Sequence, residues 1–126
     1  MKDSIIQQKT KDFALRIIKL YKYLTIAAEQ KEYILSKQVL RSGTSIGANV
    51  KEALRGQSRP DFRSKMNIAL KEASETEYWL DLLYEAEYIN ESAYRSIIDE
   101  NVEIIKILTS IVKSTAPLPQ TINQAP

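Results

Sequence analysis

The shortage of helix-breaking residues constrains this chain most. Only three glycines and four prolines occur among 126 residues, and three of the prolines, Pro117, Pro119 and Pro126, lie in the last ten positions. Glycine and proline are the two residue types that most oppose a helix interior. The remaining roughly 115 residues can fold as long helices, so the sequence predicts an all-α protein.

Apolar residues recur at three- and four-residue steps in four segments, which is the pattern of amphipathic helices. The expected helices run from about Ser4 to Glu29, Ser36 to Gly56, Pro60 to Glu87 and Glu91 to Ser114. The short links between them favour an antiparallel up-and-down four-helix bundle. We assign residues 1–114 to this single domain, and residues 115–126, rich in Pro, Gln and Asn, to a disordered tail.

The ends of the expected helices carry recognisable signals. Ser4 and Asn90 are candidate N-caps, because their side chains can accept hydrogen bonds from backbone N–H groups of the first turn. Gly56 suits the stop of the second helix, and Pro60 suits the first turn of the third. These signals place the turns of the bundle.

Small and polar residues mark the packing face of the second helix. Gly43 and Gly47 are four residues apart on its apolar side. Glycine costs roughly 1 kcal/mol relative to alanine inside a helix, so the pair predicts that another backbone packs close to this face. Asn49 flanks the same face. We hypothesise that its hydrogen bonds fix the register between the second and third helices.

The absence of cysteine and histidine excludes several functions. Disulfides, thiolate chemistry, Cys/His zinc sites and Ser-His or Cys-His nucleophile pairs cannot form within one chain. No cofactor or metal is expected. The N-terminus lacks a signal-peptide core and no apolar run approaches a membrane span. We therefore expect a cytoplasmic protein without a membrane partner.

The net charge of +2 hides an asymmetry between the two halves of the chain. Residues 1–71 contain fifteen Lys/Arg and six Asp/Glu, whereas residues 72–126 contain three and ten. Such a split indicates either a surface for a polyanion or subunits that meet through opposite charges. Pairing between antiparallel helices of one chain is the plainer interpretation.

A basic stripe runs along the second expected helix, on the side away from its apolar face, and extends through the following turn. Its members are Lys37, Arg41, Lys51, Arg55, Arg59 and Arg63. A row of cations suits a phosphate backbone, because each contact releases a counterion. The stripe contains no aromatic residue for base stacking, so binding would be weakly sequence-specific. Alternatively the stripe is a solvated face or pairs with the third helix, where Arg41 would lie near Glu77.

The third and fourth expected helices carry more apolar residues than one face needs. On the third helix, Ile68, Trp79 and Leu82 fall outside the main stripe. On the fourth, Ile104, Ile107 and Ile111 lie off the centre of a stripe formed by residues such as Ile105. We predict that these six residues form an interface between subunits of a homo-oligomer.

Two pairs of acidic residues suggest one enzymatic alternative. Glu72 and Glu75, with Glu100 and Glu103, mimic the paired ExxE spacing of all-α magnesium-dependent nucleotide pyrophosphohydrolases. Carboxylates three residues apart on facing helices can hold Mg²⁺. All four lie off the apolar stripes, and no residue set for a base or ribose is evident, so we expect a protein that is not an enzyme.

The segments Phe13–Tyr21, Leu40–Ala53, Asp61–Phe62 and Ala69–Leu80 resemble, in order and spacing, a bacterial family of four-helix bundles. This is the 23S rRNA intervening sequence protein family, also called the S23 ribosomal protein family. It is similar to the accessory variability determinant of diversity-generating retroelements, a basic pentameric barrel that engages nucleic acid and a reverse transcriptase.

The resemblance implies a bundle that assembles into a ring of five subunits, with Arg41, Lys51 and Arg55 as the first positions to contact RNA or a protein. The leading hypothesis is a non-enzymatic oligomer that binds RNA or a ribonucleoprotein partner through the basic stripe. The alternative is a structural or protein-interaction module without nucleic-acid binding.

Overall fold

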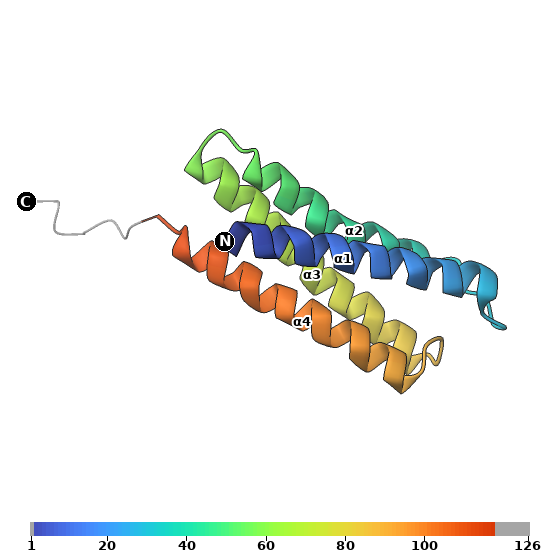
Figure 1. The fold of residues 1–126 in the computed structure, drawn as a ribbon. Helices are drawn as coiled ribbons and strands as arrows, with labels where there is room; N and C mark the ends of the chain where they lie inside the picture. The colour runs from blue at the N-terminus through green and yellow to red at the C-terminus, as the bar shows by residue number, and fades with distance from the viewer. Residues whose placement is uncertain (1, 118–126) are drawn as a thin grey trace, which may run out of the picture.

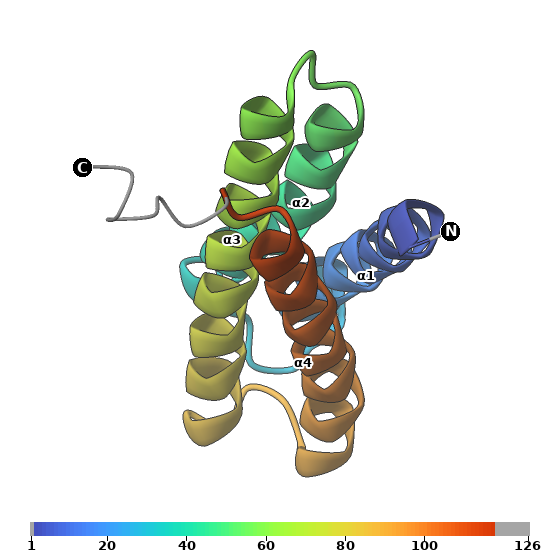
Figure 2. The same ribbon diagram turned by 90° about the vertical axis from the view of Figure 1, so that its left-hand side faces the viewer.

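The computed structural model of the chain describes residues 2–117, with side chains from Ile5 onward. The helices are α1 (Lys2–Lys22), α2 (Leu35–Leu54), α3 (Arg59–Glu85) and α4 (Glu91–Ser114), and α1 continues into a π-helical turn, η1 (Tyr23–Ala27). Successive helices run in opposite directions (Figure 1). Figure 2 shows the bundle along its length, with α1 diverging from α4 toward its N-terminus. The predicted all-α four-helix bundle is confirmed.

Most of the predicted helix ends are correct, because capping chemistry is local. Asn90 accepts a hydrogen bond from the Ala93 N–H at 2.8 Å and caps α4 as predicted. Pro60 lies in the first turn of α3, whose N-cap is Ser58. The Ser4 prediction is wrong, since α1 begins at Lys2 and Ser4 lies inside it.

Apolar side chains from all four helices form the core at the centre of the bundle. The fully buried residues include Ile6, Phe13, Ile17, Leu24, Val39, Ile46, Val50, Met66, Leu80, Leu83 and Leu108. They recur at helical spacing on the inward side of each helix, so burial of this stripe drives the assembly of the helices.

The two glycines of α2 lie against α1. A Cβ atom placed on Gly43 would sit 2.8 Å from Cγ1 of Ile17, and one on Gly47 would sit 3.3 Å from the carbonyl oxygen of Thr10. At Gly47 the neighbouring atoms belong to backbone, so the two helices approach closely there. The predicted close packing is confirmed, and α1 is the partner.

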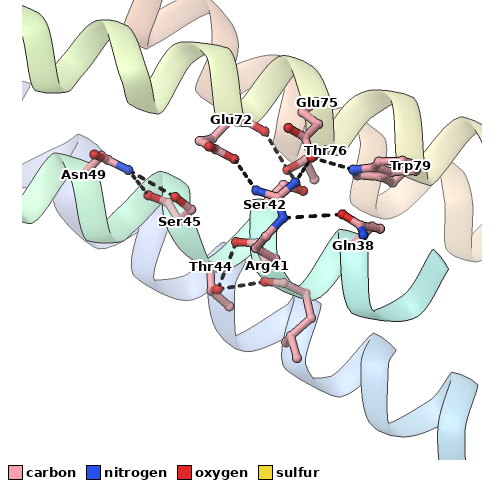
Figure 3. Close-up of polar contacts among 11 residues, drawn as sticks. Gln38, Arg41, Ser42, Thr44, Ser45, Asn49, Glu72, Glu75, Thr76 and Trp79 are labelled. Atoms are coloured by element: carbon pink, nitrogen blue, oxygen red, sulfur yellow. Dashed lines mark hydrogen bonds and ion pairs between the residues drawn. The ribbon is translucent and has the colours of Figure 1, made fainter. Parts of the chain in front are cut away.

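The register between helices is set by buried polar pairs other than the one we hypothesised. The buried hydroxyls of Ser42 and Thr76 share a hydrogen bond of 2.8 Å between α2 and α3 (Figure 3). The Asn101 amide donates to the Ala73 carbonyl at 3.0 Å between α4 and α3. Among residues 5–117, the Asn49 amide donates only to Ser45, within its own helix (Figure 3). The hypothesis that Asn49 fixes the register is therefore wrong.

The face that α4 turns to the core differs from the predicted one. Ile104 and Ile111 are 2% and 3% exposed and pack in the core of a single chain. Their assignment to an interface between subunits is wrong, because the fold already covers them. Asn101 is fully buried beside them. Asn101 lies in the middle of the inward face, but a polar residue does not count toward an apolar stripe. The prediction therefore centred the stripe near Ile105, which is only partly buried.

The end of the described chain follows α4 directly. The Thr115 hydroxyl donates to the Ile111 carbonyl at 2.8 Å and continues the polar contacts of the last turn. Residues 118–126 of the predicted disordered tail lie outside the described residues. Within residues 2–117, none of the helices has the length and apolar composition that crossing a bilayer requires.

Candidate nucleic-acid interface

The predicted basic stripe is divided between the two ends of α2. Lys37 lies in the first turn and Lys51 in the last turn of this helix. A rise of 1.5 Å per residue separates them by about 21 Å along the axis. Both side chains are exposed, and neither forms an ion pair with any other described residue. The predicted stripe therefore consists of two separate groups of cations, one toward each end of α2.

Arg41 is neutralised by α3. Its guanidinium forms ion pairs with Glu72, at 3.4 Å, and with Glu75 (Figure 3). Glu75 also accepts a hydrogen bond from the indole N–H of Trp79 at 2.8 Å (Figure 3). The predicted neighbour Glu77 is not the partner, because the register set by Thr76 places Glu72 and Glu75 opposite Arg41.

The other end of α2 keeps its cations free. Lys51 and Arg55 are exposed and make no ion pair among the described residues. They line a hollow of about 530 Å³ together with Lys65 of α3. Glu52 and Asp61 line the same hollow, and Lys65 pairs with Glu52 at 3.5 Å. This hollow holds three cations and two carboxylates.

A second hollow of about 400 Å³ lies on the other side of the first turns of α3. Arg59 and Arg63 line it with the polar side chains of Ser64, Asn67 and Thr115. The Arg59 guanidinium donates to the Ser114 carbonyl at 3.2 Å and so stabilises the C-terminus of α4. The Nε atom of Arg63 is buried and has no hydrogen-bond partner among residues 5–117.

The fold therefore gathers cations at one end of the bundle, where the α2–α3 turn meets the C-terminus of α4. We call the following set the basic end: Lys51, Arg55, Arg59, Arg63, Lys65 and Lys113. Four of the six were predicted from the stripe. Lys65 was missed because it lies on the other side of the first turns of α3 from Arg59 and Arg63. Lys113 was missed because it lies on α4, whose end meets the α2–α3 turn only in the packed bundle.

The four carboxylates of the enzymatic alternative do not converge. Glu72 and Glu75 pair with Arg41 in the seam between α2 and α3. In the seam between α1 and α4, Glu103 pairs with Lys9 at 2.6 Å and Glu100 pairs with Arg16 at 2.8 Å. Across the described chain, no group of three or more potential metal ligands comes together. The ExxE spacing reflects ion pairs between helices.

The remaining predicted interface residues fall on two separate flanks. Trp79 binds Glu75, the partner of Arg41, so it lies on the flank of α3 nearest α2. Ile68, 37% exposed, and Leu82, partly exposed, share this side of α3 by helical spacing. Ile107 follows Glu103 by four residues on α4 and so faces the α1 side.

Comparison with known proteins agrees with this architecture. The chain is 54% identical to a protein with unknown function from the S23 ribosomal protein family of Bacteroides thetaiotaomicron VPI-5482, whose crystal structure superposes with a TM-score of 0.85. The similarity covers 90% of this chain and 99% of that chain. No curated protein matches this chain. The family model described as 23S rRNA-intervening sequence protein matches residues 2–110, so the chain belongs to that family.

Proposed function

We propose that this protein is a non-enzymatic helical bundle that binds RNA, alone or within a ribonucleoprotein, through its basic end. The gathering of six cations from three helices, five of which line two hollows, carries the proposal. Guanidinium groups bind phosphate bidentately, and each neutralised phosphate releases counterions.

Recognition of RNA at this end would depend on shape and charge. All seven tyrosines and the single tryptophan lie in the half of the bundle away from the basic end. Stacking of unpaired bases needs such aromatic surfaces, whereas double-stranded RNA is read mostly through its phosphates and ribose hydroxyls. A structured RNA hairpin is therefore the expected class of ligand.

A titration of an RNA hairpin at several salt concentrations tests the proposal. The log–log slope of affinity against salt should fall by about 1.5 in the Lys51→Glu/Arg55→Glu variant, because two phosphate contacts are lost. The matched control is Lys19→Glu/Lys22→Glu, which makes the same change of charge on exposed residues of α1. Circular dichroism should show that both variants remain folded.

Two results would count against RNA binding. Equal affinity of the two double variants would mean that the ends of the bundle are equivalent for RNA. Absence of binding by the wild-type protein at low salt would favour the alternative, a structural or protein-interaction module. The pairing of Arg41 with Glu72 and Glu75 is the observation on which that alternative rests.

The proposal includes self-association, with five subunits as the number that the family resemblance implies. The partly exposed flank of α3 that carries Ile68, Trp79 and Leu82 is the surface that we assign to it. Native mass spectrometry of the wild type and of Ile68→Asp/Leu82→Asp tests the assignment. A ring that dissociates in the variant supports it, and an unchanged assembly places the interface elsewhere.

A further inference from the structure

The end of the bundle opposite the basic end carries a hollow walled by tyrosines. It measures about 430 Å³ and lies over the turn between α3 and α4, where Tyr23, Tyr84 and Tyr88 line it with Glu87 and Asn90. It shares Tyr23 and Asn90 with a neighbouring hollow of about 550 Å³ between α1 and α4. Neither hollow belongs to the basic end described above.

The aromatic rings of this hollow are partly accessible and partly fixed. Tyr23 is 47% exposed. The ring of Tyr84 stacks on Tyr94 with centroids 4.4 Å apart and an interplanar angle of 11°. The Tyr94 hydroxyl donates to Asp81, which holds the stacked pair in place. A ring held from behind presents a preformed surface, so binding there costs little ordering of side chains.

Glu87 is the charged side chain that lines the hollow, and the turn beneath it belongs to an acid-rich segment. Residues 77–99 contain six acidic side chains and one basic side chain, Arg95. That arginine lies 3.7 Å from Glu91 and is already paired. In the neighbouring hollow, Arg16 is neutralised by Glu100. Lys19 also lines the neighbouring hollow, and it forms no ion pair with any described residue.

Tyrosine faces combined with carboxylates favour a cation. The ring quadrupole attracts a guanidinium or ammonium group placed over it, and Glu87 supplies a full negative charge at the same hollow. An unpaired nucleobase could also stack on these rings, but its phosphates would be repelled by Glu87 at the hollow. Charge complementarity therefore selects a basic polypeptide over a nucleic acid.

We propose that the tyrosine-walled hollow binds an arginine side chain of a basic protein segment. The guanidinium would lie against Tyr23 and Tyr84, with Glu87 as its counter-ion. The inference goes beyond RNA binding and does not depend on it, because it concerns the other end of the molecule. Together the two ends would let one bundle contact RNA and the basic proteins that accompany RNA.

Isothermal titration with a hexa-arginine peptide at low ionic strength, in the absence of RNA, tests the site. The expected result is binding by the wild type and a loss of about fivefold in Tyr23→Ala. Tyr23→Phe should retain the wild-type affinity, since the ring face and not the hydroxyl makes the contact. Glu87→Gln should weaken binding to a similar degree, because the counter-ion is lost.

The controls separate this site from general attraction to an acidic surface. Tyr33→Ala removes an equally exposed tyrosine, 54% accessible, that lines neither hollow, and should bind like the wild type. Hexa-citrulline, the uncharged analogue of the peptide, should not bind. Equal binding by Tyr23→Ala and wild type would overturn the proposal, as would equal binding of the two peptides. If Tyr23→Ala instead weakened RNA binding, the occupant would be a base.

Discussion

At the scale of single residues, the bundle depends on a few positions where the side chain is unusually small or the backbone is unusual. Gly43 is buried against Ile17, and Glu87 adopts a φ of 68°, the left-handed conformation that favours glycine. The sequence points to the first, because a glycine inside a helix is costly. It does not point to the second, because glutamate carries no signal for that conformation.

Gly43→Ala should destabilise the protein by about 1 kcal/mol, despite the better helix propensity of alanine. The new Cβ would meet Cγ1 and Cγ2 of Ile17 at 2.8 and 2.9 Å, and a β-branched side chain has no free rotamer to escape. Urea unfolding measures the change. In an Ile17→Ala background, which removes Cγ1 and Cγ2 and leaves Cβ at 3.2 Å, Gly43→Ala should be less destabilising. An unchanged cost in that background would contradict the packing argument.

Glu87→Gly should stabilise the protein by about 0.5–1 kcal/mol. Glu87 follows the C-cap of α3 in a Schellman motif, in which its N–H donates to Tyr84 and the Tyr88 N–H donates to Leu83. Glycine keeps these bonds without the steric cost of a Cβ. Glu85→Gly, at the last residue of α3, is the control and should be destabilising. If both changes destabilise, the left-handed conformation costs less than we infer.

At the scale of helices, polar pairs between neighbours fix register where apolar surfaces alone permit sliding. Ser42 with Thr76 fixes α2 against α3, and Asn101 with the Ala73 carbonyl fixes α4 against α3. A buried polar group that lacks its partner is costly, so only one register satisfies each pair. The same seam between α3 and α4 carries the contact between Tyr94 and Asp81.

The contact of Tyr94 with Asp81 should make stability fall at high pH. The hydrogen bond that the Tyr94 hydroxyl donates to Asp81 is the main cause that raises the pKa of Tyr94 from 10.0 to about 12, and burial adds to it. Because the folded-state pKa lies above the unfolded one, the stabilisation is complete below pH 10. It is lost as the pH rises from 10 to about 12.

Denaturant unfolding of the wild type and of Tyr94→Phe across this pH window measures the contribution. The free energy of unfolding of the wild type should fall more steeply between pH 10 and 12. The difference between the two proteins should be largest below pH 10 and should shrink above it. Parallel pH profiles would mean that Tyr94 titrates normally.

At the scale of the whole molecule, the bundle has two chemically different ends. Six cations gather where α2 meets α3, whereas the tyrosines and the acid-rich segment 77–99 lie toward the turn between α3 and α4. The sequence is basic before residue 72 and acidic after it. In the folded bundle, some of these opposite charges lie at different ends of the axis, and others form ion pairs between helices.

The position of an arginine along the axis should decide its role. Arg41 and Arg55 share one face of α2 but lie about 21 Å apart. Arg41 is paired with α3, whereas Arg55 forms no ion pair among the described side chains. In the RNA titration, Arg55→Gln should weaken binding by roughly threefold and lower the salt slope by about 1, whereas Arg41→Gln should leave both nearly unchanged. The reverse order would place the RNA along the α2–α3 seam.

Local chemistry explains why the sequence predicts the helices so well. Helix breakers, the Asn90 cap and Pro60 act within a few residues of their own position, so they define α4 and the start of α3 without any partner. The glycines of α2 likewise indicate that another helix packs closely against this face, but they do not identify that helix.

Rotation and register, in contrast, were decided only by the tertiary structure. The buried Asn101 shows that the inward face of α4 is chosen by satisfied hydrogen bonds as well as by apolar count, which is why Ile104 belongs to the core. Likewise Arg41 is neutralised only because Thr76 sets which acids lie opposite it. A residue carries its propensity and charge in the sequence, but its partners depend on side chains from other helices, and these meet only after the helices have packed.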